Sequence, residues 1–331
     1  MLLHRLVLCA TALGALALAT SANAAGPPLP SSASGKAGAV APGGSERILT
    51  HRAGRDTVVV AVRRSDGSRL RSRRIRGRWS IPAVTLYNGT TGLSADGSTL
   101  VLARPTRSFP PATTPLAVLD AQRLAVRRHV TLPGFFTVDA ISPDGRWVYL
   151  IQYRGDDVFD YRVRALDTRT GRLAAGDIVD PRKPDEQMGG LPMTRVMSQD
   201  GRWAYTLYGG GRETFIHALD TVGQTAACID LEMLPPESDL SGVRLQVSPD
   251  GSRVQVRDQG RLVATVDART FAVHEPSANT TPPARRQPTS EADGVPPLVL
   301  VIGAAGLFAI ALAFARRRGR GRPAGRVAPR A

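Results

Sequence analysis

The sequence has few cysteines, and this shortage excludes a disulfide-stapled fold. It contains two cysteines in 331 residues. Cys9 lies in an apolar leader that we expect to be removed, so Cys228 alone would remain and no internal disulfide could form. Cys228 lies in the apolar run TAACIDL, which predicts a buried and unreactive thiol.

Lysine is also nearly absent: Lys36 and Lys183 are the only lysines among 43 basic residues. This arginine skew, with abundant Ala, Gly and Pro, is typical of a GC-rich bacterial genome. The formal net charge is +15, but without Arg5 and the seven arginines of 316–331 the chain has 35 basic against 28 acidic residues. We therefore predict no nucleic-acid partner.

Catalytic and metal-binding motifs are missing. The chain has no G-x-S-x-G, no H-E-x-x-H and no phosphate-binding loop, and its four histidines after the leader lack metal-ligand spacing (His51, His129, His217 and His274). Asp156, Asp157 and Asp160 could offer oxygen ligands to Ca²⁺, but they lack the D-x-D-x-D-G pattern and are better interpreted as exposed loop acids. We predict no catalytic residue, metal or cofactor from the motifs, although a catalytic site distributed over several repeats stays open.

The N-terminus has the pattern of a targeting signal. A basic start, an apolar run over 6–19 and the small-residue pattern Ala22-Asn23-Ala24 predict a signal peptide over 1–24. The alternative is a first transmembrane helix, for which the apolar run is short. Residues 25–45 are rich in Gly, Ala, Ser and Pro and are expected to be a flexible linker.

The C-terminal end has the pattern of a membrane anchor. Residues 294–315 form an uncharged and largely apolar segment, which is long enough for one transmembrane helix. The arginine tail 316–331 contains no acidic residue and is expected in the cytoplasm. A buried core helix is the alternative, but it gives no reason for such a tail. Residues 277–293 indicate a Pro/Thr-rich stalk. Together the two ends predict a single-pass protein of the cell membrane whose body, 46–276, is extracellular.

The body contains a repeat. ISPDGRWVYLIQ returns as MSQDGRWAYTLY, and two looser copies are LSADGSTLVLA and VSPDGSRVQVR. The first landmark is Ser-x-Asp-Gly, with its Asp-Gly pairs at Asp96-Gly97, Asp144-Gly145, Asp200-Gly201 and Asp250-Gly251. A second landmark alternates with it, at Asp120, Asp167, Asp220 and Asp267. Two landmarks in a constant order, four times over, indicate a structural repeat.

Both landmarks predict turns between strands. In Ser-x-Asp-Gly the glycine accepts a positive φ, and the Ser and Asp side chains can bond nearby backbone N–H groups. In D-T-x-T-G the aspartate is expected to open a turn and the glycine to close it. Flanking runs such as RWVYLIQY and DYRVRALD alternate with period two, as half-buried strands do. Each unit of about 50 residues therefore predicts four antiparallel strands, the blade of a β-propeller.

The phrase SPDGRWVYL followed by ALDTRTG resembles the β-propeller repeats of the YVTN type and of TolB-like proteins. The resemblance covers roughly residues 46 to 276. It implies an all-β propeller fold and leaves the function open, because such propellers include binding proteins, assembly scaffolds and some enzymes.

We predict about five four-stranded blades. Full units are expected to begin near Val84, Phe135, Thr194 and Val243, and residues 47–75 supply most of a fifth blade. The N-terminal strands could complete the C-terminal unit, as when a ring closes through a shared blade. Trp147 and Trp203 occupy equivalent places in two repeats, which indicates packing between blades rather than ligand stacking.

The variable loops are the candidate binding surface. Loops between second and third strands, and connections between blades such as 180–192 and 233–242, are irregular, whereas the landmark turns are regular. Irregular loops on a rigid scaffold usually carry recognition. The candidate binding residues are Arg154, Asp156, Asp157, Arg182, Lys183, Asp185, Glu186, Arg212 and Glu213.

A separate arginine cluster lies at the start of the body. Residues 47–78 hold 11 arginines, accompanied by Glu46, Asp56 and Asp66. The cluster could attract anionic lipid headgroups or acidic wall polymers. The alternative, a basic and solvated sheet edge that discourages edge pairing, is favoured.

These observations predict a membrane-anchored extracytoplasmic propeller that binds a protein or a cell-envelope polymer. The alternatives are a propeller hydrolase or lactonase-like enzyme with a site at the channel mouth, and a structural subunit of an envelope complex.

Overall fold

The fold is described from a computed structural model. The structure describes residues 38–86, 89–106, 109–155, 157–185 and 188–276. The expected signal peptide, the stalk, the membrane segment and the arginine tail lie outside the described residues, as does the linker up to residue 37. Within the described ranges, the single helical turn is the 3-10 turn Leu240–Gly242, so no helix there could cross a membrane.

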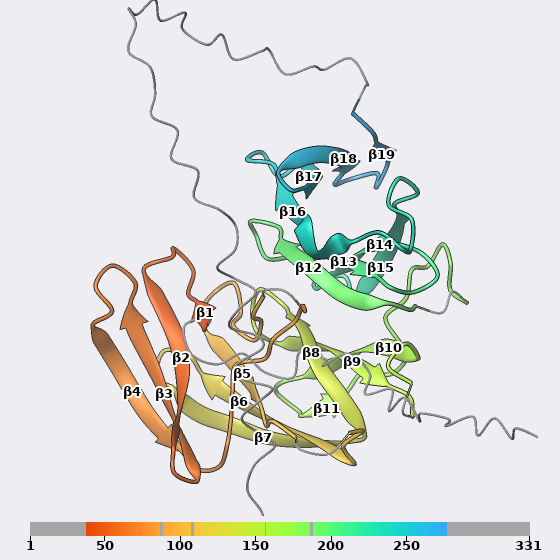
Figure 1. Ribbon diagram of the computed structural model, residues 1–331. Coiled ribbons are helices and arrows are strands. Elements are labelled where there is room, and N and C mark those ends of the chain that lie inside the picture. Colours follow the sequence, from red (N-terminus) through yellow and green to blue (C-terminus); the bar gives the residue numbers. More distant parts are fainter. Residues whose placement is uncertain (1–37, 87–88, 107–108, 156, 186–187, 277–331) are drawn as a thin grey trace, which may run out of the picture. The chain divides into compact units, whose positions relative to one another are not determined.

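Five antiparallel sheets follow one another along the chain (Figure 1). Sheet 1 contains β1 (Ala39–Val40), β2 (Glu46–Ala53), β3 (Asp56–Arg63) and β4 (Arg69–Ile75). Sheet 2 has three strands, β5 (Thr99–Ala103), β6 (Thr113–Asp120) and β7 (Ala125–Pro133). Sheet 3 contains β8 (Phe135–Ile141), β9 (Trp147–Tyr153), β10 (Tyr161–Asp167) and β11 (Arg172–Leu173).

The last two sheets have the same up-and-down order. Sheet 4 contains β12 (Leu191–Met197), β13 (Trp203–Gly209), β14 (Phe215–Asp220) and β15 (Thr225–Asp230). Sheet 5 contains β16 (Val243–Val247), β17 (Arg253–Asp258), β18 (Arg261–Asp267) and β19 (Val273–His274). The all-β fold with about five four-stranded units is therefore confirmed for the described residues.

Two predictions about how the chain is divided into blades and linkers need correction. Sheets 1 and 5 each contain four strands from their own stretch of chain, so the N-terminal strands do not complete the C-terminal unit. In addition, β1 lies inside the segment 25–45 that we interpreted as a linker. Ala39 pairs with Ile48 of β2 and is buried, which explains why this short stretch is ordered as a strand.

Sheet 2 departs from the expected unit that begins near Val84. Its first-strand position is taken by an irregular segment that contacts β5 through isolated bridges, Leu93 with Leu100 and Ser80 with Ala103. Pro82 lacks an N–H to donate to a ladder, and Gly92 has a φ of +101°. A continuous strand is therefore interrupted here, whereas units begin near Phe135, Thr194 and Val243 as expected.

The core lies between consecutive sheets rather than within any one of them. Five clusters of buried apolar side chains join neighbouring sheets: one each between sheets 1 and 2, 2 and 3, and 4 and 5, and two between sheets 3 and 4. Central strands are therefore covered on both faces, and β13 has six buried residues out of seven. The strand β4, at the edge of sheet 1, has one buried residue, Ile75. Each sheet thus depends on its neighbours for the burial that stabilises it.

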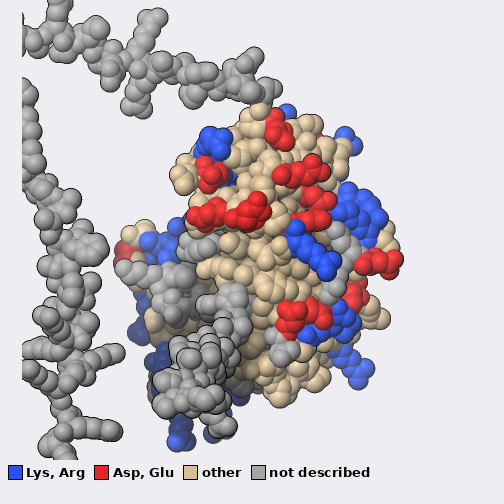
Figure 2. Space-filling view, turned by 45° about the vertical axis from the view of Figure 1, so that its right-hand side comes forward, with Lys and Arg blue, Asp and Glu red and all other residues tan. Residues whose placement is uncertain are grey.

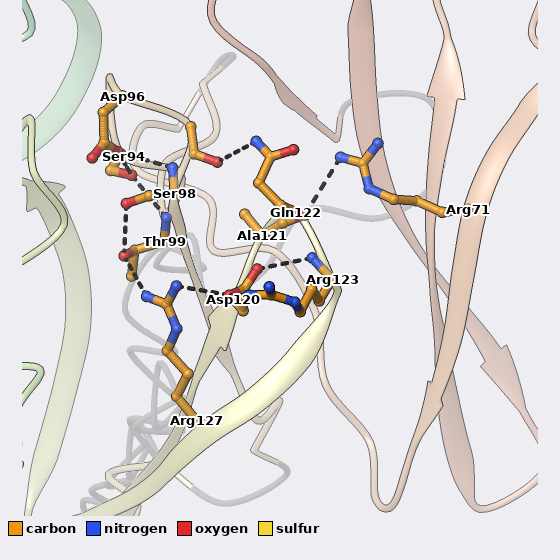
Figure 3. A network of polar contacts seen from close by, with 11 residues as sticks. Arg71, Ser94, Asp96, Ser98, Thr99, Asp120, Ala121, Gln122, Arg123 and Arg127 are labelled. Atoms are coloured by element: carbon orange, nitrogen blue, oxygen red, sulfur yellow. Dashed lines mark hydrogen bonds and ion pairs between the residues drawn. The ribbon is translucent and has the colours of Figure 1, made fainter.

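The Ser-x-Asp-Gly turns have the predicted geometry (Figure 3). In the first, Ser94 Oγ donates to Asp96 Oδ1 at 2.5 Å, Asp96 Oδ1 accepts the N–H of Ser98, and Ser94 Oγ accepts the N–H of Thr99. The same three bonds recur in the turns of Asp144, Asp200 and Asp250. The four glycines have φ values of +68° to +73°. The glycine is required because this region costs other residues about 1–2 kcal/mol.

The second landmark also forms turns, with one correction. Asp120, Asp167, Asp220 and Asp267 each accept backbone N–H groups two or three residues ahead. The positive φ falls four residues after the aspartate, and only one copy places glycine there, Gly171; the others have Leu124, Gln224 and Phe271. Glycine therefore does not close this turn generally. Burial of Leu124, 1% exposed, offsets the backbone cost in one copy.

The tryptophans pack between sheets, as predicted. Trp203 of sheet 4 meets the ring of Phe271, which lies before β19 of sheet 5, edge-on with centroids 5.4 Å apart. Trp147 packs against the cluster between sheets 3 and 4. Both rings also have a neighbouring arginine guanidinium over one face.

The Ser-x-Asp-Gly turns of different sheets contact one another. Asp96 N donates to Pro143 O at 3.0 Å, and Gln199 Nε2 donates to Pro249 O at 2.8 Å. A methyl group on Gly201 would lie 2.5 Å from Ala95 Cβ, whereas one on Gly251 would meet nothing within 4 Å. These two glycines have nearly the same φ. Alanine would therefore strain the backbone equally at both positions, but only at Gly201 would it also collide with a neighbouring turn.

We predict that Gly251→Ala lowers the free energy of unfolding by about 1–2 kcal/mol, the cost of the left-handed backbone. Gly201→Ala should lower it further, because its methyl group also collides with the neighbouring turn. Urea unfolding of the two variants and the wild-type protein measures the difference. Equal losses in the two variants would show that contacts between turns do not contribute.

Candidate functional site

Two adjoining cavities lie where sheets 3 and 4 meet the variable loops. The larger measures about 490 Å³ and is lined by the β9–β10 and β13–β14 loops and by Phe215 and Asp230. The smaller measures about 310 Å³ and is lined by Tyr161, His217 and the connection from sheet 3 to sheet 4. Met188 and Cys228 line both cavities. We call the two cavities together the cleft.

Six of the nine predicted binding residues line this cleft. Arg154, Lys183 and Asp185 line the smaller cavity, and Asp157, Arg212 and Glu213 line the larger one. The structure thus brings together three loops that are separate in the sequence. Asp156 and Glu186 lie outside the described residues, and Arg182 acts beside the cleft rather than in its lining.

The charges at the rim fall into paired and unpaired groups. Arg154 pairs with Asp160 at 2.5 Å, and Lys183 pairs with Asp230 at 3.0 Å. Arg212 and Glu213 are exposed and form no ion pair with any described residue. In the view of Figure 2, basic and acidic side chains are interspersed over the molecular surface. The rim therefore presents charges of both signs, and two of them are available to a ligand.

Asp180 anchors the connection that forms one wall. Its carboxylate is buried, accepts the N–H of Cys228 at 2.9 Å and binds the guanidinium of Arg182 at 2.6 Å. Burial opposes ionisation, but the hydrogen bonds from Arg182 and from the Cys228 and Arg182 N–H groups lower the pKa of Asp180 to about 2. Beside it, Ala226 N donates to Val179 O at 3.1 Å. The connection is thereby fixed to the edge of β15, a role that sequence reasoning did not assign to Asp180.

A row of polar residues crosses sheet 4 beneath the cleft. Arg195, Thr206, His217 and Cys228 are paired in register on neighbouring strands, so their side chains share one face of the sheet. That face packs on sheet 3, where Arg195 binds the backbone carbonyl and the carboxylate of Asp139. Arg195 Nε also donates to Thr206 Oγ1 at 2.7 Å. A buried ion pair thus joins the two sheets.

Asp139 reaches this position through a bulge. The register of β8 with β9 shifts between Val138 and Ala140, which leaves Asp139 as the extra residue. A bulge redirects a side chain relative to the regular alternation of its strand. The carboxylate of Asp139 is 0% exposed and the side chain of Arg195 is 6% exposed, so the pair is fully within the seam.

Five buried polar atoms near this pair have no hydrogen-bond partner among the described residues: both ring nitrogens of His217, the hydroxyls of Tyr161 and Tyr208, and Oδ2 of Asp139. The Tyr208 ring lies near those of Tyr161 and His217, with centroids 6.1 and 6.2 Å away. Buried polar groups are nearly always satisfied by protein or by water, so these atoms are candidates for contact with an internal water or with a ligand. Of these residues, His217 and Tyr161 line the smaller cavity.

Burial keeps His217, Tyr161 and Tyr208 uncharged. It lowers the pKa of His217 to about 4, although the negative charge of Asp139 acts in the opposite direction. Burial raises the pKa values of Tyr161 and Tyr208 well above the usual value. At neutral pH the site therefore offers a neutral imidazole and two phenol hydroxyls.

The remaining predictions about single residues have mixed outcomes. Cys228 was expected to be buried, but it is half-buried on the edge strand β15, where it packs against the cluster that contains Tyr161, Tyr208 and Phe215. His129 stacks on Trp79 with centroids 5.3 Å apart. His51 and His274 are exposed. No group of three or more metal-ligating residues occurs among the described residues.

The arginine cluster of residues 47–78 lies on and around sheet 1. Arg71 pairs with Glu46 at 2.8 Å, and Arg63 pairs with Asp66 at 3.0 Å. Arg69 and Arg73 on β4 are exposed and form no ion pair with a described residue. Whether this surface meets anionic polymers stays a hypothesis.

The sequence matches no protein family model and no curated protein. Similar solved structures include TolB from Acinetobacter baumannii, 13% identical with a TM-score of 0.39 over 71% of this chain and 55% of that chain. A putative TolB from Agrobacterium tumefaciens is 16% identical, with a TM-score of 0.41 over 72% and 79% of the two chains. A β-propeller domain from Myceliophteria thermophila is 12% identical, with a TM-score of 0.43 over 73% and 68%.

These structures are TolB-like and other β-propeller proteins, the group that the repeat resembles. At this identity and TM-score the likeness indicates neither activity nor ligand. The assignment of blades rests on the strand pairing of this chain.

We predict that Asp180→Asn lowers the free energy of unfolding by about 1.5–3 kcal/mol, because hydrogen bonds to a buried charge are lost. Asp230→Asn, at an exposed ion pair on the same strand edge, should cost at most about 1 kcal/mol. Urea unfolding of both variants measures the two losses. Similar losses would contradict the anchoring role of Asp180.

Stability should also depend on pH through His217. Between pH 6.5 and about 4 the unfolded chain takes up a proton at this residue while the folded chain does not. Acidification across this interval therefore destabilises the protein, by at most about 1.4 kcal/mol per pH unit. His217→Leu should remove this part of the slope, measured as urea midpoints at several pH values. An unchanged slope in the variant would contradict a buried neutral imidazole.

Proposed function

We propose that the protein is a membrane-anchored, extracytoplasmic binding module that holds a protein or cell-envelope polymer in the cleft between sheets 3 and 4. The observation that carries the proposal is the convergence of three variable loops on one cleft whose rim has unpaired Arg212 and Glu213. Concave sites with a few convergent polar groups are the usual places for ligands. The export signal and the anchor belong to this proposal as expectations from the sequence.

The loops that form the cleft are held in place by the sheets, and this rigidity favours selective binding. The loops leave strands that are buried on both faces, and the connection is fixed by Asp180 to β15. A rim held in place before the ligand arrives loses less conformational entropy on binding. Arg154 N donates to Asp160 O at 2.8 Å, which also closes the β9–β10 loop on itself.

The geometry gives less support to a hydrolase. Nucleophilic catalysis requires a hydroxyl or thiol within hydrogen-bond reach of a base. Neither nitrogen of His217 accepts or donates a hydrogen bond among the described residues, and the nearby tyrosines are held as neutral phenols. These groups are suited to contact a ligand without reacting with it.

Replacing Arg212 and Glu213 by serine should weaken capture of the ligand about ten-fold or more, because each charged hydrogen bond contributes about 1.5–3 kcal/mol. The substitution leaves the net charge unchanged. The measurement is the apparent affinity of the full-length protein for purified envelope preparations from the host bacterium.

The matched control replaces Arg261 and Glu275, two exposed residues of opposite charge at sheet 5, by serine. This variant should bind as the wild-type protein does. Equal binding by the Arg212/Glu213 variant and the control would refute the cleft as the binding site.

A further inference from the structure

We propose that the smaller cavity is a subsite for an uncharged polyhydroxyl group, a sugar ring, whose hydroxyls bind His217 and Tyr161. This inference rests on the proposed function and specifies the chemical class of the ligand. It arises from polar atoms that are buried, unsatisfied and placed at a cavity. The relative exposure of His217 is 1% and that of Tyr161 is 4%.

The hydrogen-bonding capacity of these atoms defines the ligand. A neutral imidazole has one N–H donor and one nitrogen acceptor, and a phenol hydroxyl both donates and accepts. The site therefore needs a partner that can donate and accept at nearly the same place. A sugar hydroxyl does both, so each hydroxyl can satisfy two protein groups at once.

Charged ligands fit this part of the cleft less well. A carboxylate or a phosphodiester only accepts hydrogen bonds, so it would leave the acceptor nitrogen of His217 unsatisfied. It would also lie in a cavity lined by Asp177, Asp180 and Asp185. An ammonium group only donates, and it would enter a cavity that Arg154, Arg162 and Lys183 also line. Charges of both signs around the cavity thus disfavour either ion.

The apolar surfaces beside these groups suit the other side of a sugar ring. Phe215 and the 38%-exposed Phe159 line the larger cavity, which shares Met188 and Cys228 with the smaller one. The face of an aromatic ring is negative and attracts the weakly positive C–H groups of a sugar. Since the two cavities adjoin, a second ring of a glycan chain could continue from one cavity into the other.

The neighbouring polar groups keep the subsite in position. Asp139 binds Arg195, Arg195 binds Thr206, and Thr206 is paired directly with His217 across sheet 4. Tyr208 lies behind them with its ring stacked on Phe215 at a centroid distance of 5.3 Å. The neighbouring strands on both sides hold the imidazole of His217 in place. Binding of a ligand therefore costs little conformational entropy at this side chain.

The test measures binding of maltose and of N,N′-diacetylchitobiose to the full-length protein by saturation-transfer NMR, with inorganic phosphate as a competitor. We expect one or both disaccharides to bind and phosphate not to displace them.

His217→Leu and Tyr161→Phe should each weaken binding about ten-fold. Tyr205→Phe is the matched control, because Tyr205 is buried in the same sheet but belongs to the cluster shared with sheet 5; it should bind normally.

The outcomes separate this inference from the proposed function. If neither disaccharide binds, or if both variants bind normally, the sugar subsite is refuted. If phosphate displaces the disaccharide, the ligand class is wrong. Absence of binding together with lower thermal stability of Tyr161→Phe would assign the unsatisfied atoms to internal water, which also overturns the proposal. The envelope-capture measurement on the Arg212/Glu213 variant tests the proposed function independently.

Discussion

The seam between sheets 3 and 4 depends on the buried ion pair of Asp139 and Arg195. Neither side chain is exposed enough for water to replace its partner, and removal of one partner of such a pair costs about 3–5 kcal/mol. The pair requires the bulge in β8, because regular alternation would not direct Asp139 toward Arg195. Once a polar pair occupies the seam, its neighbours Thr206 and His217 can be polar as well. The polar character of this part of the cleft therefore depends on the Asp139–Arg195 ion pair and on the bulge in β8 that positions Asp139.

The scaffold and the site use polar residues in opposite ways. Each landmark aspartate accepts backbone N–H groups within its own turn, so the geometry of the turn is set by residues close in sequence. Their contribution is geometric: they set where each strand ends, and five apolar clusters then join the sheets. In the seam, by contrast, Asp139 and Arg195 are 56 residues apart and each is satisfied only if two sheets meet in the correct register.

This contrast also decides how much the sequence could predict. The turns are local, so Ser, Asp and Gly within four residues were sufficient to predict the all-β fold and the units that begin near Phe135, Thr194 and Val243. The irregular segment before β5 was not predicted. The loops of the cleft were also identified, because irregular segments such as 154–160 stand out against regular repeats. Asp139, Asp180 and His217 were missed, since their roles come from pairing between distant strands and from a bulge that leaves no mark in the local pattern. Glycine closes the second turn in the copy with Gly171, as predicted, but Leu124, Gln224 and Phe271 hold this position in the other copies.

Folding alone does not explain the buried polar atoms of His217, Tyr161 and Tyr208 that have no hydrogen-bond partner among the described residues. Each buried polar group without a partner costs about 1–3 kcal/mol, and leucine or phenylalanine at these positions would avoid the cost. The other seams of the described residues show that this chain can fill an interface with apolar side chains. At the seam of sheets 3 and 4 it retains a histidine and two tyrosines beside an open cavity. A polar partner that enters from the cleft would form hydrogen bonds with these atoms, so the feature that costs folding stability would contribute to the affinity for a ligand.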